Sequence, residues 1–596
     1  MRFAGCRCRG RSCAKNAGSI GMNCSLLSRS PDIVDFVRLL QDRAERTPSG
    51  LAFTMDDGAA GQETRVSYAQ LHAAACRVAS ALTARALAGE RVLLMLQPGA
   101  DYVAGLFGCW YAGATAVPVY APRQNASSDR VRHIAGDCQA AAILSTAPAL
   151  DTLGGGFLPG GHRIAIEAIP ADAHALWRMP RIDGDTLAAL QYTSGSTGHP
   201  KGVRLRHRHL MENSRIISAA MRTTLETVCV IWVPPYHDMG LIGGLLQPLY
   251  GGFPVHLMSP AAFLQRPLRW LEAISRHRAT LSAAPNFAFD LCVRRARPED
   301  LSRLDLSCWQ VAANGAEPIR AETMRRFAAT FAPAGFDARA FFPCFGMAEA
   351  TLLVTGARPF EGAVTCAFDR AALSGGRLAP ADGEQPAVEL VSSGRVAPGV
   401  QVAIVDPATS RCRAPGEVGE VWVSGATVAD GYWGRLDATR EVFEARLPGS
   451  GAAWLRTGDL GALQDGELYV TGRIKDLIVI RGQNHHPQDI EATALASHPA
   501  LLRPLGAAAF GIDTADGEAL GLVLELDRGW RASDLEAVRL AVLEAVSREH
   551  QLQVATLVLV RPHAIPKTSS GKVQRSLTRQ RWRAGELDAL GDEVAA

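Results

Sequence analysis

Residues 190 to 202 read LQYTSGSTGHPKG, and this stretch is the most informative part of the chain. An apolar run leads into six positions that hold four hydroxyls and two glycines: Thr193, Ser194, Gly195, Ser196, Thr197 and Gly198. Hydroxyls and bare backbone N–H groups can wrap a phosphate chain, glycine permits sharp torsions, and Lys201 adds a positive charge. The composition therefore indicates a polyphosphate-binding loop, although an exposed Ser/Gly linker has a similar composition.

The loop is not a Walker loop, because G-x-x-x-x-G-K-[ST] does not occur in the chain. The nearest match, SSGKVQ at 569–574, has Val where Ser or Thr is required. The sequence therefore disfavours ordinary P-loop ATPases.

Strand-like and helical segments alternate on the amino-terminal side of this loop. Residues 66–87 and 131–139 have a helical period, whereas residues 91–96 and 141–146 are short apolar runs. This alternation predicts an α/β fold.

The pattern changes after the charged GRIKD at 472–476. Apolar strands at 519–527 and 555–562 flank a helix expected at about 532–549, which together make a compact α+β unit. We place a domain boundary near Gly472–Lys475.

Composition disfavours several other classes of protein. The 596 residues carry a formal net charge of +3, so no strong global field attracts nucleic acid or an anionic membrane. Thirteen scattered cysteines indicate a reducing cytoplasm rather than an extracellular disulfide framework.

Residues 1–30 lack the apolar core of a secretory signal, so we expect a disordered tail there. The longest uncharged run, at 102–122, is broken by glycines and prolines, which predicts a buried helix and a strand rather than an integral membrane protein.

YTSGSTGHPKG closely resembles the signature loop of the adenylate-forming superfamily, which includes acyl-CoA synthetases, luciferases and nonribosomal adenylation domains. The resemblance extends from about Pro31 to the carboxyl terminus. It implies a large multi-subdomain N-terminal domain that binds ATP and an acyl group, over 31–472, and a small mobile α+β C-terminal domain over 473–596.

Further motifs imply the rest of an ATP site. VAANGAEPI at 311–319 resembles the loop that lies against adenine, through Asn314, Gly315 and Ala316. In FFPCFGMAEATLL at 341–353 the resemblance makes Phe345 the ring that stacks on adenine, followed by Gly346 and Met347, and makes Glu349 a Mg²⁺ ligand. Tyr is usual at the position of Phe345, so the hydroxyl is absent while the stacking face remains. A carboxylate suits Mg²⁺, which prefers hard oxygen donors.

The last motifs imply the ribose contact, the hinge and the catalytic lysine. By resemblance, Asp459 in WLRTGDLG accepts from the ribose hydroxyls, Arg473 in GRIKD reaches the ribose or phosphate, and Lys475 is the hinge. Lys572 in IPKTSSGKVQR is the catalytic lysine, which bridges the attacking carboxylate and the α-phosphate. Lys572, Lys201 and His237 are the predicted catalytic set.

Two segments look most like fatty acyl-AMP ligases, which pass the acyl group to an acyl carrier protein rather than to CoA: WVPPYHDMGLIGG at 232–244 and CFGMAEATLLVTG at 344–356. The segment between Glu349 and Gly394 is also longer than is usual in the CoA-forming relatives, which implies a branch-specific insertion or a plain loop extension within 357–389. His237 is expected beside the bound carboxylate. The expected tunnel lining is Met239, Leu241, Ile242 and Gly243.

Other functions remain open at this stage. A fatty acyl-CoA synthetase is the main alternative. A nonribosomal-type adenylation enzyme would need an acid such as Asp238 to hold an amino group. A non-catalytic nucleotide-binding protein is disfavoured by the joint presence of Lys201, Glu349, Asp459 and Lys572. The expected partners are a fatty acid and a separate phosphopantetheinylated acyl carrier protein, which the basic residues 575–583 could contact.

Overall fold

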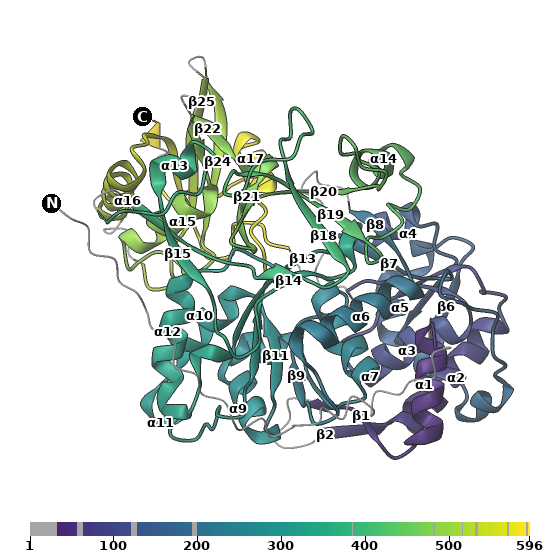
Figure 1. Cartoon of the computed structure of the whole chain (residues 1–596). Coiled ribbons are helices and arrows are strands. Elements are labelled where there is room, and N and C mark those ends of the chain that lie inside the picture. Colours follow the sequence, from purple (N-terminus) through teal and green to yellow (C-terminus); the bar gives the residue numbers. More distant parts are fainter. Residues whose placement is uncertain are drawn as a thin grey trace, which may run out of the picture. The chain divides into compact units, whose positions relative to one another are not determined.

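The structure, a computed structural model, describes most of the chain (Figure 1). The described residues are 33–56, 63–120, 128–193, 200–383, 386–480, 483–514, 517–530, 535–568, 571–591 and 594–595. Residues 34–596 belong to one contact unit. The tail predicted at 1–30 and the loop residues Ser194 to Gly198 lie outside the described residues.

A six-stranded sheet in the order β6-β5-β3-β4-β7-β8 confirms the predicted α/β alternation. Its strand pairs are parallel except for β7 with β8. A Cβ at Gly108 would lie 2.4 Å from Val78, so this glycine allows α3 to pack closely on α2. The elements are α2 (Tyr68–Thr83), β3 (Arg91–Leu94), α3 (Ala100–Tyr111), β4 (Thr115–Pro118), α4 (Asp129–Asp137), β5 (Ala142–Ser145), α5 (Ala147–Leu153), β6 (His162–Ala165), β7 (Leu187–Thr193) and β8 (Lys201–Arg206).

The long uncharged run forms α3 and β4, as predicted. Every residue of α3 from Tyr102 to Tyr111 is buried in the protein. In the described part of the chain, no helix combines the length and the apolar character needed to cross a membrane.

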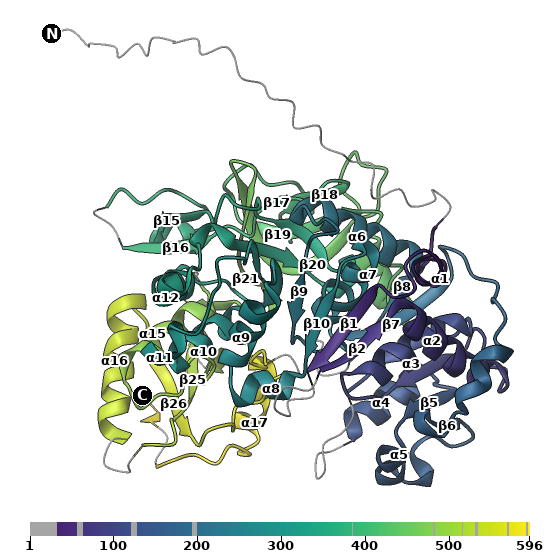
Figure 2. The ribbon, with the colours of Figure 1, turned by 90° about the horizontal axis from the view of Figure 1, so that it is seen from below.

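A thirteen-stranded sheet, in the order β18-β19-β20-β21-β17-β14-β13-β12-β11-β9-β10-β1-β2, forms the centre. The strands β9 to β13 run parallel, so their carboxyl ends meet at one edge of the sheet. Figure 2 shows β9, β10 and β1 side by side in this sheet. An aromatic cluster that includes Trp270, Phe289 and Trp309 packs beneath them.

The elements of this central region follow in chain order. They are α1 (Phe36–Arg46), β1 (Leu51–Asp56), β2 (Glu63–Ser67), α6 (His207–Met221), β9 (Cys229–Ile231), the π-helix η5 (Met239–Leu246), α7 (Gln247–Gly251), β10 (Val255–Met258), α8 (Pro260–Gln265), α9 (Leu268–His277), β11 (Leu281–Ala284), α10 (Asn286–Arg295), α11 (Pro298–Leu301), β12 (Val311–Asn314), α12 (Ala321–Phe331), β13 (Phe341–Gly346), the 3₁₀-helix η8 (Ala348–Ala350), β14 (Leu353–Gly356), β17 (Arg395–Val396), β18 (Val400–Val405), β19 (Gly419–Gly425), α14 (Leu436–Phe443), β20 (Leu455–Gln464) and β21 (Glu467–Arg473).

The long segment after Glu349 folds as a small unit of its own. β15 (Thr365–Asp369) and β16 (Ala387–Val391) pair only with each other among the described strands, and α13 (Arg370–Ser374) follows β15. Phe368, in β15, packs edge-on against Tyr469 of β21 at 5.2 Å between ring centroids. α13 also contacts β23 (Gln483–His485), so this segment touches the chain on both sides of Lys475.

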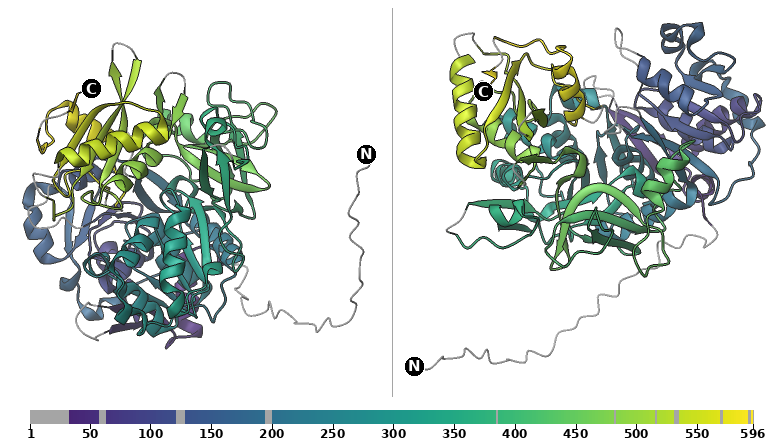
Figure 3. Two further views of the ribbon diagram at one scale, coloured as in Figure 1. Left: turned by 90° about the vertical axis from the view of Figure 1, so that its left-hand side faces the viewer. Right: turned by 90° about the horizontal axis from the view of Figure 1, so that it is seen from above.

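The chain after β21 builds separate sheets, among the described strands. β22 (Ile478–Ile480) pairs with β23 (Gln483–His485), and the last four strands form a sheet in the order β24-β25-β26-β27. α16, expected at about 532–549, spans Leu535–His550 and lies along this sheet through Val538, Val542 and Val546 (Figure 3). The other elements are the 3₁₀-helix η9 (Ile474–Asp476), α15 (Pro487–Ser497), β24 (Ala507–Thr514), β25 (Gly517–Glu525), β26 (Val554–Val560), α17 (Arg575–Arg583) and β27 (Val594–Ala595).

Candidate active site

One cavity of about 710 Å³ is lined by most of the predicted site residues that the structure describes. Its walls come from β7, β8, β9, β11, β13, η5, η9 and the loop before α17. Segments hundreds of residues apart in sequence therefore share one space.

The phosphate-binding loop is framed by two paired strands. Thr193 ends β7 and Lys201 begins β8, and the two residues are antiparallel partners. Both line the cavity. The loop that joins them therefore starts and ends at the cavity, although Ser194 to Gly198 lie outside the described residues.

Tyr432 links Lys201 to Glu349. The Lys201 Nζ lies 4.9 Å from the centre of the Tyr432 ring, and the Tyr432 hydroxyl donates to Glu349 Oε1 at 3.0 Å. Backbone bonds position this tyrosine, since Trp433 N–H donates to Gly202 and Ala429 N–H donates to the Glu349 carbonyl. Burial raises the pKa of Glu349, and the hydrogen bond from Tyr432 opposes that rise. The motifs did not reveal Tyr432, because its role depends on contacts with distant strands.

The predicted adenine-binding residues gather at the carboxyl ends of β12 and β13. Ala316, Phe345, Gly346 and Met347 line the cavity, while Asn314 is fully buried at the end of β12. A Cβ at Gly346 would lie 1.8 Å from a carbonyl oxygen, and a Cβ at Gly315 would lie 2.9 Å from another, so only glycine fits at either position. Phe345 and the backbone of Gly346 therefore border the cavity at this end of β13.

Asp459 and Arg473 form a pair across β20 and β21. Arg473 Nε donates to Asp459 Oδ1 at 2.7 Å, and the two residues are register partners. Arg473 and Gly458 line the cavity, while Asp459 is buried beside them. The carboxylate predicted to bind ribose is therefore held in place by the arginine predicted to assist it.

Lys572 lies in a tight turn and lines the same cavity. Thr568 N–H donates to the Lys572 carbonyl at 2.8 Å, and Lys572 N–H donates to the Thr568 hydroxyl at 3.0 Å. Burial lowers the pKa of Lys572 and so does nearby Arg473, while Asp238, Asp459 and Glu317 oppose the change. Lys572 therefore stands among charged groups of the large domain.

Two further residues position this turn. Arg575 binds Glu491 at 2.6 Å and Asp476 of η9 at 2.9 Å, so the turn is tied to the segment that holds Lys475. Glu317 accepts from Phe287 N–H at 2.6 Å, and a Cβ at Gly571 would lie 3.4 Å from the Phe287 ring. Glu317 and Arg575 both lie within the quoted motifs, but the sequence did not indicate these contacts, since the partners are distant in the chain.

The basic helix α17 is less available to a partner than its composition indicates. Arg579 and Arg583 both bind Asp513, at 2.8 and 2.7 Å, and Arg575 is engaged as described above. Three of the four arginines at 575–583 are therefore engaged in ion pairs within the protein. This weakens the expectation that they form a surface for a carrier protein.

The apolar part of the cavity agrees only in part with the predicted tunnel lining. Met239 and Gly243 line it, whereas Leu241 and Ile242 are buried in the surrounding core and lie outside the lining. The helical turn of η5 explains the difference, because residues four apart share a face and their neighbours point elsewhere. Other apolar lining residues are Ile217, Met221, Cys229, Ile231, Leu281, Ala283, Leu352 and Leu353.

His237 lines the cavity two residues before Met239, the first residue of η5. Burial lowers its pKa to about 4, with nearby Asp238 opposing and Lys572 reinforcing the change. The imidazole is therefore neutral near pH 7 and can orient a carboxylate without adding a charge.

Comparisons with known proteins agree with this geometry. A family model described as AMP-binding enzyme matches residues 40–433, and a model of the AMP domain of Disco-interacting protein 2-like proteins matches residues 475–591. The fold and site define an adenylate-forming enzyme, and the chain belongs to the AMP-binding enzyme family.

Relatives that match nearly the whole length of the chain indicate which branch of the family it belongs to. The medium-chain-fatty-acid–[acyl-carrier-protein] ligase JamA of Moorena producens is 42% identical over 94% of this chain and 96% of its own length. A 4-hydroxyphenylalkanoate adenylyltransferase of Mycobacterium tuberculosis is 37% identical, over 93% and 92% of the two chains. A fatty acyl-adenylate ligase structure from L. pneumophila, in complex with acyl adenylate and pyrophosphate, is 39% identical, with a TM-score of 0.74 over 94% of this chain and 98% of that one. The chain belongs to the fatty acyl-AMP ligase branch of the family.

Proposed function

We propose that the protein activates a fatty acid with ATP and then transfers the acyl group to the phosphopantetheine thiol of an acyl carrier protein. In the first step a carboxylate oxygen attacks the α-phosphorus of ATP, the bond to the β-phosphate breaks, and pyrophosphate leaves with acyl-AMP as product. In the second step the thiol attacks the acyl carbonyl and AMP leaves. The observation that carries the proposal is the position of Lys201 and Lys572 in one cavity that continues between apolar walls.

Both lysines would offset the same charge repulsion, because an anionic carboxylate must attack an anionic phosphate. Lys572 would bridge the attacking carboxylate and the α-phosphate, and Lys201 would stabilise charge on the leaving pyrophosphate. Thr193 and the loop Ser194 to Gly198 would donate to the phosphate chain. Neutral His237 would orient the substrate carboxylate at the mouth of the apolar region.

The nucleoside of ATP fits the other end of the cavity. Phe345 would stack on adenine, and the backbone at Asn314 to Ala316 would follow the edge of the base. Asp459 would accept from the ribose hydroxyls, with Arg473 holding it in place. Gly346 and Met347 would complete the groove floor.

A magnesium ion suits this site. Glu349 presents a buried carboxylate to the cavity, a hard oxygen donor of the kind that Mg²⁺ prefers, and the Tyr432 hydroxyl orients it. When bound, the ion would neutralise charge on the ATP phosphates.

Carrier-protein transfer requires that Lys572 withdraw after adenylation. We propose that residues 473–596 move as a unit about Lys475, which is exposed in η9 between β21 and β22. The insertion at 357–389 would limit this movement to one acceptor geometry, since α13 contacts β23 beyond the hinge. The relative JamA, named for carrier-protein ligation, supports the same acceptor. We expect the enzyme to act in the cytoplasm, where ATP and holo carrier proteins occur together.

One incubation tests the function. The protein is offered ATP, Mg²⁺, straight-chain acids from hexanoic to hexadecanoic, and either CoA or a holo acyl carrier protein, and the products are weighed by mass spectrometry. We expect acyl-AMP in both mixtures and acyl transfer only to the carrier. Acyl-CoA as the main product would support a CoA synthetase, and ATP–pyrophosphate exchange with amino acids alone would support a nonribosomal-type enzyme. No exchange with any acid would contradict the proposal.

A further inference from the structure

Two histidines and a glutamate from three different elements meet at the end of the thirteen-stranded sheet that β10, β1 and β2 form. They are Glu63 of β2, His256 of β10 and His277, the last residue of α9. Among the described residues they are the one group of three histidine, cysteine or carboxylate side chains whose ligating atoms all lie within 4.8 Å of one another. The three residues lie outside the lining of the active-site cavity, so they are not part of the site described above.

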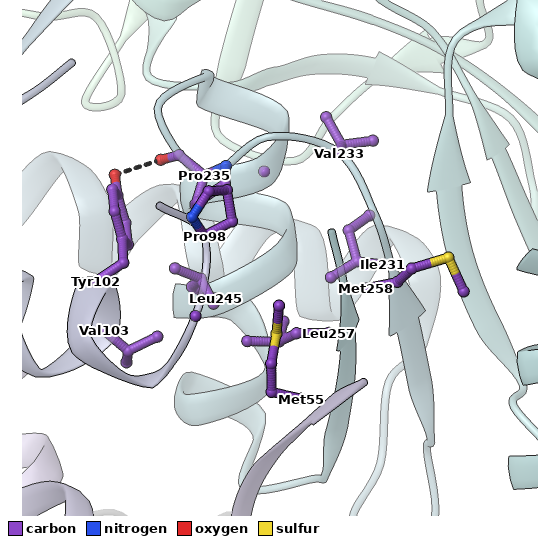
Figure 4. A pocket seen from close by; sticks show the side chains of 12 residues that line it. Met55, Pro98, Tyr102, Val103, Ile231, Val233, Pro235, Leu245, Leu257 and Met258 are labelled. Carbon is purple, nitrogen blue, oxygen red and sulfur yellow. Dashed lines mark hydrogen bonds between the residues drawn. The ribbon is translucent and has the colours of Figure 1, made fainter. Parts of the chain in front are cut away.

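The strands place His256 on the face of the sheet that meets the end of α9. Met55 of β1 and Leu257 of β10 are register partners, and both line a small cavity of about 20 Å³ (Figure 4). Side chains alternate across a strand, so Thr54 and His256, which are also register partners, point to the opposite face. There the His256 ring stacks on the His277 ring, with 3.6 Å between the ring centroids. The packing of α9 on the sheet therefore brings the two imidazoles together.

Hydrogen bonds fix the ring nitrogens of both histidines. His256 Nδ1 lies 2.7 Å from the Thr54 hydroxyl, and His277 Nε2 lies 2.7 Å from Glu63 Oε1. When His256 Nδ1 carries the proton and donates it to Thr54, Nε2 keeps a lone pair for a ligand. Histidines that bind metals donate their other ring N–H to an oxygen in this way, and the bond fixes the orientation of the ring.

The surroundings favour a cation and are open to solvent. His277 lies at the carboxyl end of α9, where the helix dipole is negative. Asp56, the register partner of Glu63, adds a second carboxylate that interacts electrostatically with His277. The side chains of Glu63 and His277 are 21% and 14% exposed, so an ion can reach them. The nearby guanidinium groups of Arg65 and Arg276 oppose a cation, so we expect a moderate affinity.

We propose that Glu63, His256 and His277 bind a transition-metal dication such as Zn²⁺, at a site separate from the magnesium site proposed at Glu349. Two imidazole nitrogens and one carboxylate oxygen are ligands that zinc prefers, whereas Mg²⁺ prefers oxygen donors. Ligands of one tetrahedral zinc ion lie about 3.3 Å apart, so a pair that is now up to 4.8 Å apart must close by no more than about 1.5 Å. The stacked rings also tilt, so that each lone pair points at the ion. The ion takes the place of the proton between Glu63 and His277, and His277 then carries its proton on Nδ1.

A metal ion at this position would fasten the end of the sheet. β2 is the last strand in the order of the thirteen-stranded sheet and pairs with β1. The ion would join β2 through side chains to β10 and to α9. Binding should therefore stabilise the folded protein, because the three ligands come together only in the folded chain.

The test measures Zn²⁺ binding to the full chain by isothermal titration calorimetry, without nucleotide. We expect the wild type to bind one more Zn²⁺ per chain than His256→Gln or Glu63→Gln, and to keep it in the presence of excess Mg²⁺. Thr54→Val, which lacks the hydroxyl that orients His256, should weaken the site by about tenfold. His162→Gln, at an exposed histidine of β6, is the matched control and should bind as the wild type does. Zn²⁺ should also raise the unfolding temperature of the wild type more than that of His256→Gln or Glu63→Gln.

Equal zinc binding by the wild type, His256→Gln and Glu63→Gln would overturn the proposal, since the three side chains would then form a stacked and hydrogen-bonded contact only. Displacement of the zinc by Mg²⁺ would also overturn it. If His256→Gln does not fold, Glu63→Gln decides the question, because it keeps both histidines and the size of the replaced side chain. ATP–pyrophosphate exchange assayed with Mg²⁺ and no zinc should be unchanged in both variants, so the metal site is tested independently of the proposed function.

Discussion

The wall made by Lys201, Tyr432 and Glu349 and the turn that carries Lys572 face the same cavity but are held in different ways. The wall belongs to β8, the segment 429–433 and η8, which are joined by backbone and side-chain hydrogen bonds within the large domain. The turn is bonded mainly to itself and is tied through Arg575 to η9 and α15. The difference supports the proposal that Lys201 and Glu349 stay in place within the large domain, whereas Lys572 moves with residues 473–596.

Removal of the Lys572 amine should have the largest effect. Lys572→Ala is expected to lower acyl-AMP formation by about 10²- to 10³-fold, because a group that stabilises charge in the transition state is lost. Thermal unfolding should be unchanged, since the turn is held by backbone and Thr568 contacts rather than by the amine. ATP–pyrophosphate exchange measures the loss, and a folded variant with near-normal exchange would contradict the assignment.

Removal of the fixed carboxylate comes next. Glu349→Gln keeps the size of the side chain but lacks its charge, and we expect exchange to fall on the order of 10²-fold with a higher Mg²⁺ requirement. A magnesium titration of the exchange rate measures both. An unchanged magnesium requirement would show that Glu349 does not hold the ion.

The hinge should separate the two half-reactions. Lys475→Pro fixes φ and lacks the backbone N–H, so residues 473–596 could no longer rotate freely. We expect acyl-AMP formation within about twofold of wild type and transfer to the carrier at least tenfold slower. Lys475→Ala, which keeps the backbone free, is the matched control and should retain both steps. Equal loss of both steps in the proline variant alone would argue against hinge motion.

Removal of the contacts that Tyr432 makes with Lys201 and Glu349 should have a smaller effect. Tyr432→Phe leaves a ring beneath Lys201 but no donor to Glu349, and a hydrogen bond to a carboxylate contributes about 1.5–3 kcal/mol. We expect exchange to fall by roughly tenfold, while Tyr432→Leu, which also lacks the ring, should fall further. Equal rates for the two variants would show that the cation–π contact contributes nothing.

The smallest effect is a shift in pH dependence. Lys572 is charged below its pKa, and burial beside Arg473 lowers that pKa from its usual 10.5, so activity should be lost as pH rises through a value below 10.5. The alkaline limb of kcat/KM for exchange reports this free-enzyme pKa. Lys572→Arg should move the limb upward, because a guanidinium stays charged above pH 12. A limb that does not move would assign it to another group.

The motifs identified most of the site because its chemistry needs particular residue types in short local patterns. Thr193, Lys201, Phe345, Glu349, Asp459 and Lys572 stand in such patterns, and the structure brings them to one cavity or beside it. The same patterns could not reveal Tyr432, Glu317 or Arg575, whose partners lie far away in sequence. They also misassigned Leu241 and Ile242, since consecutive residues of a helix point in different directions.

The sequence by itself determined the α/β class, the separate α+β unit after Gly472, and the adenylating chemistry, because hydrophobic period and catalytic residue types are local properties. Only the tertiary structure decided which side chains share the cavity and how Tyr432 joins Lys201 to Glu349. Burial and hydrogen-bond satisfaction depend on all elements packed around a residue, so they are fixed only when the chain is folded.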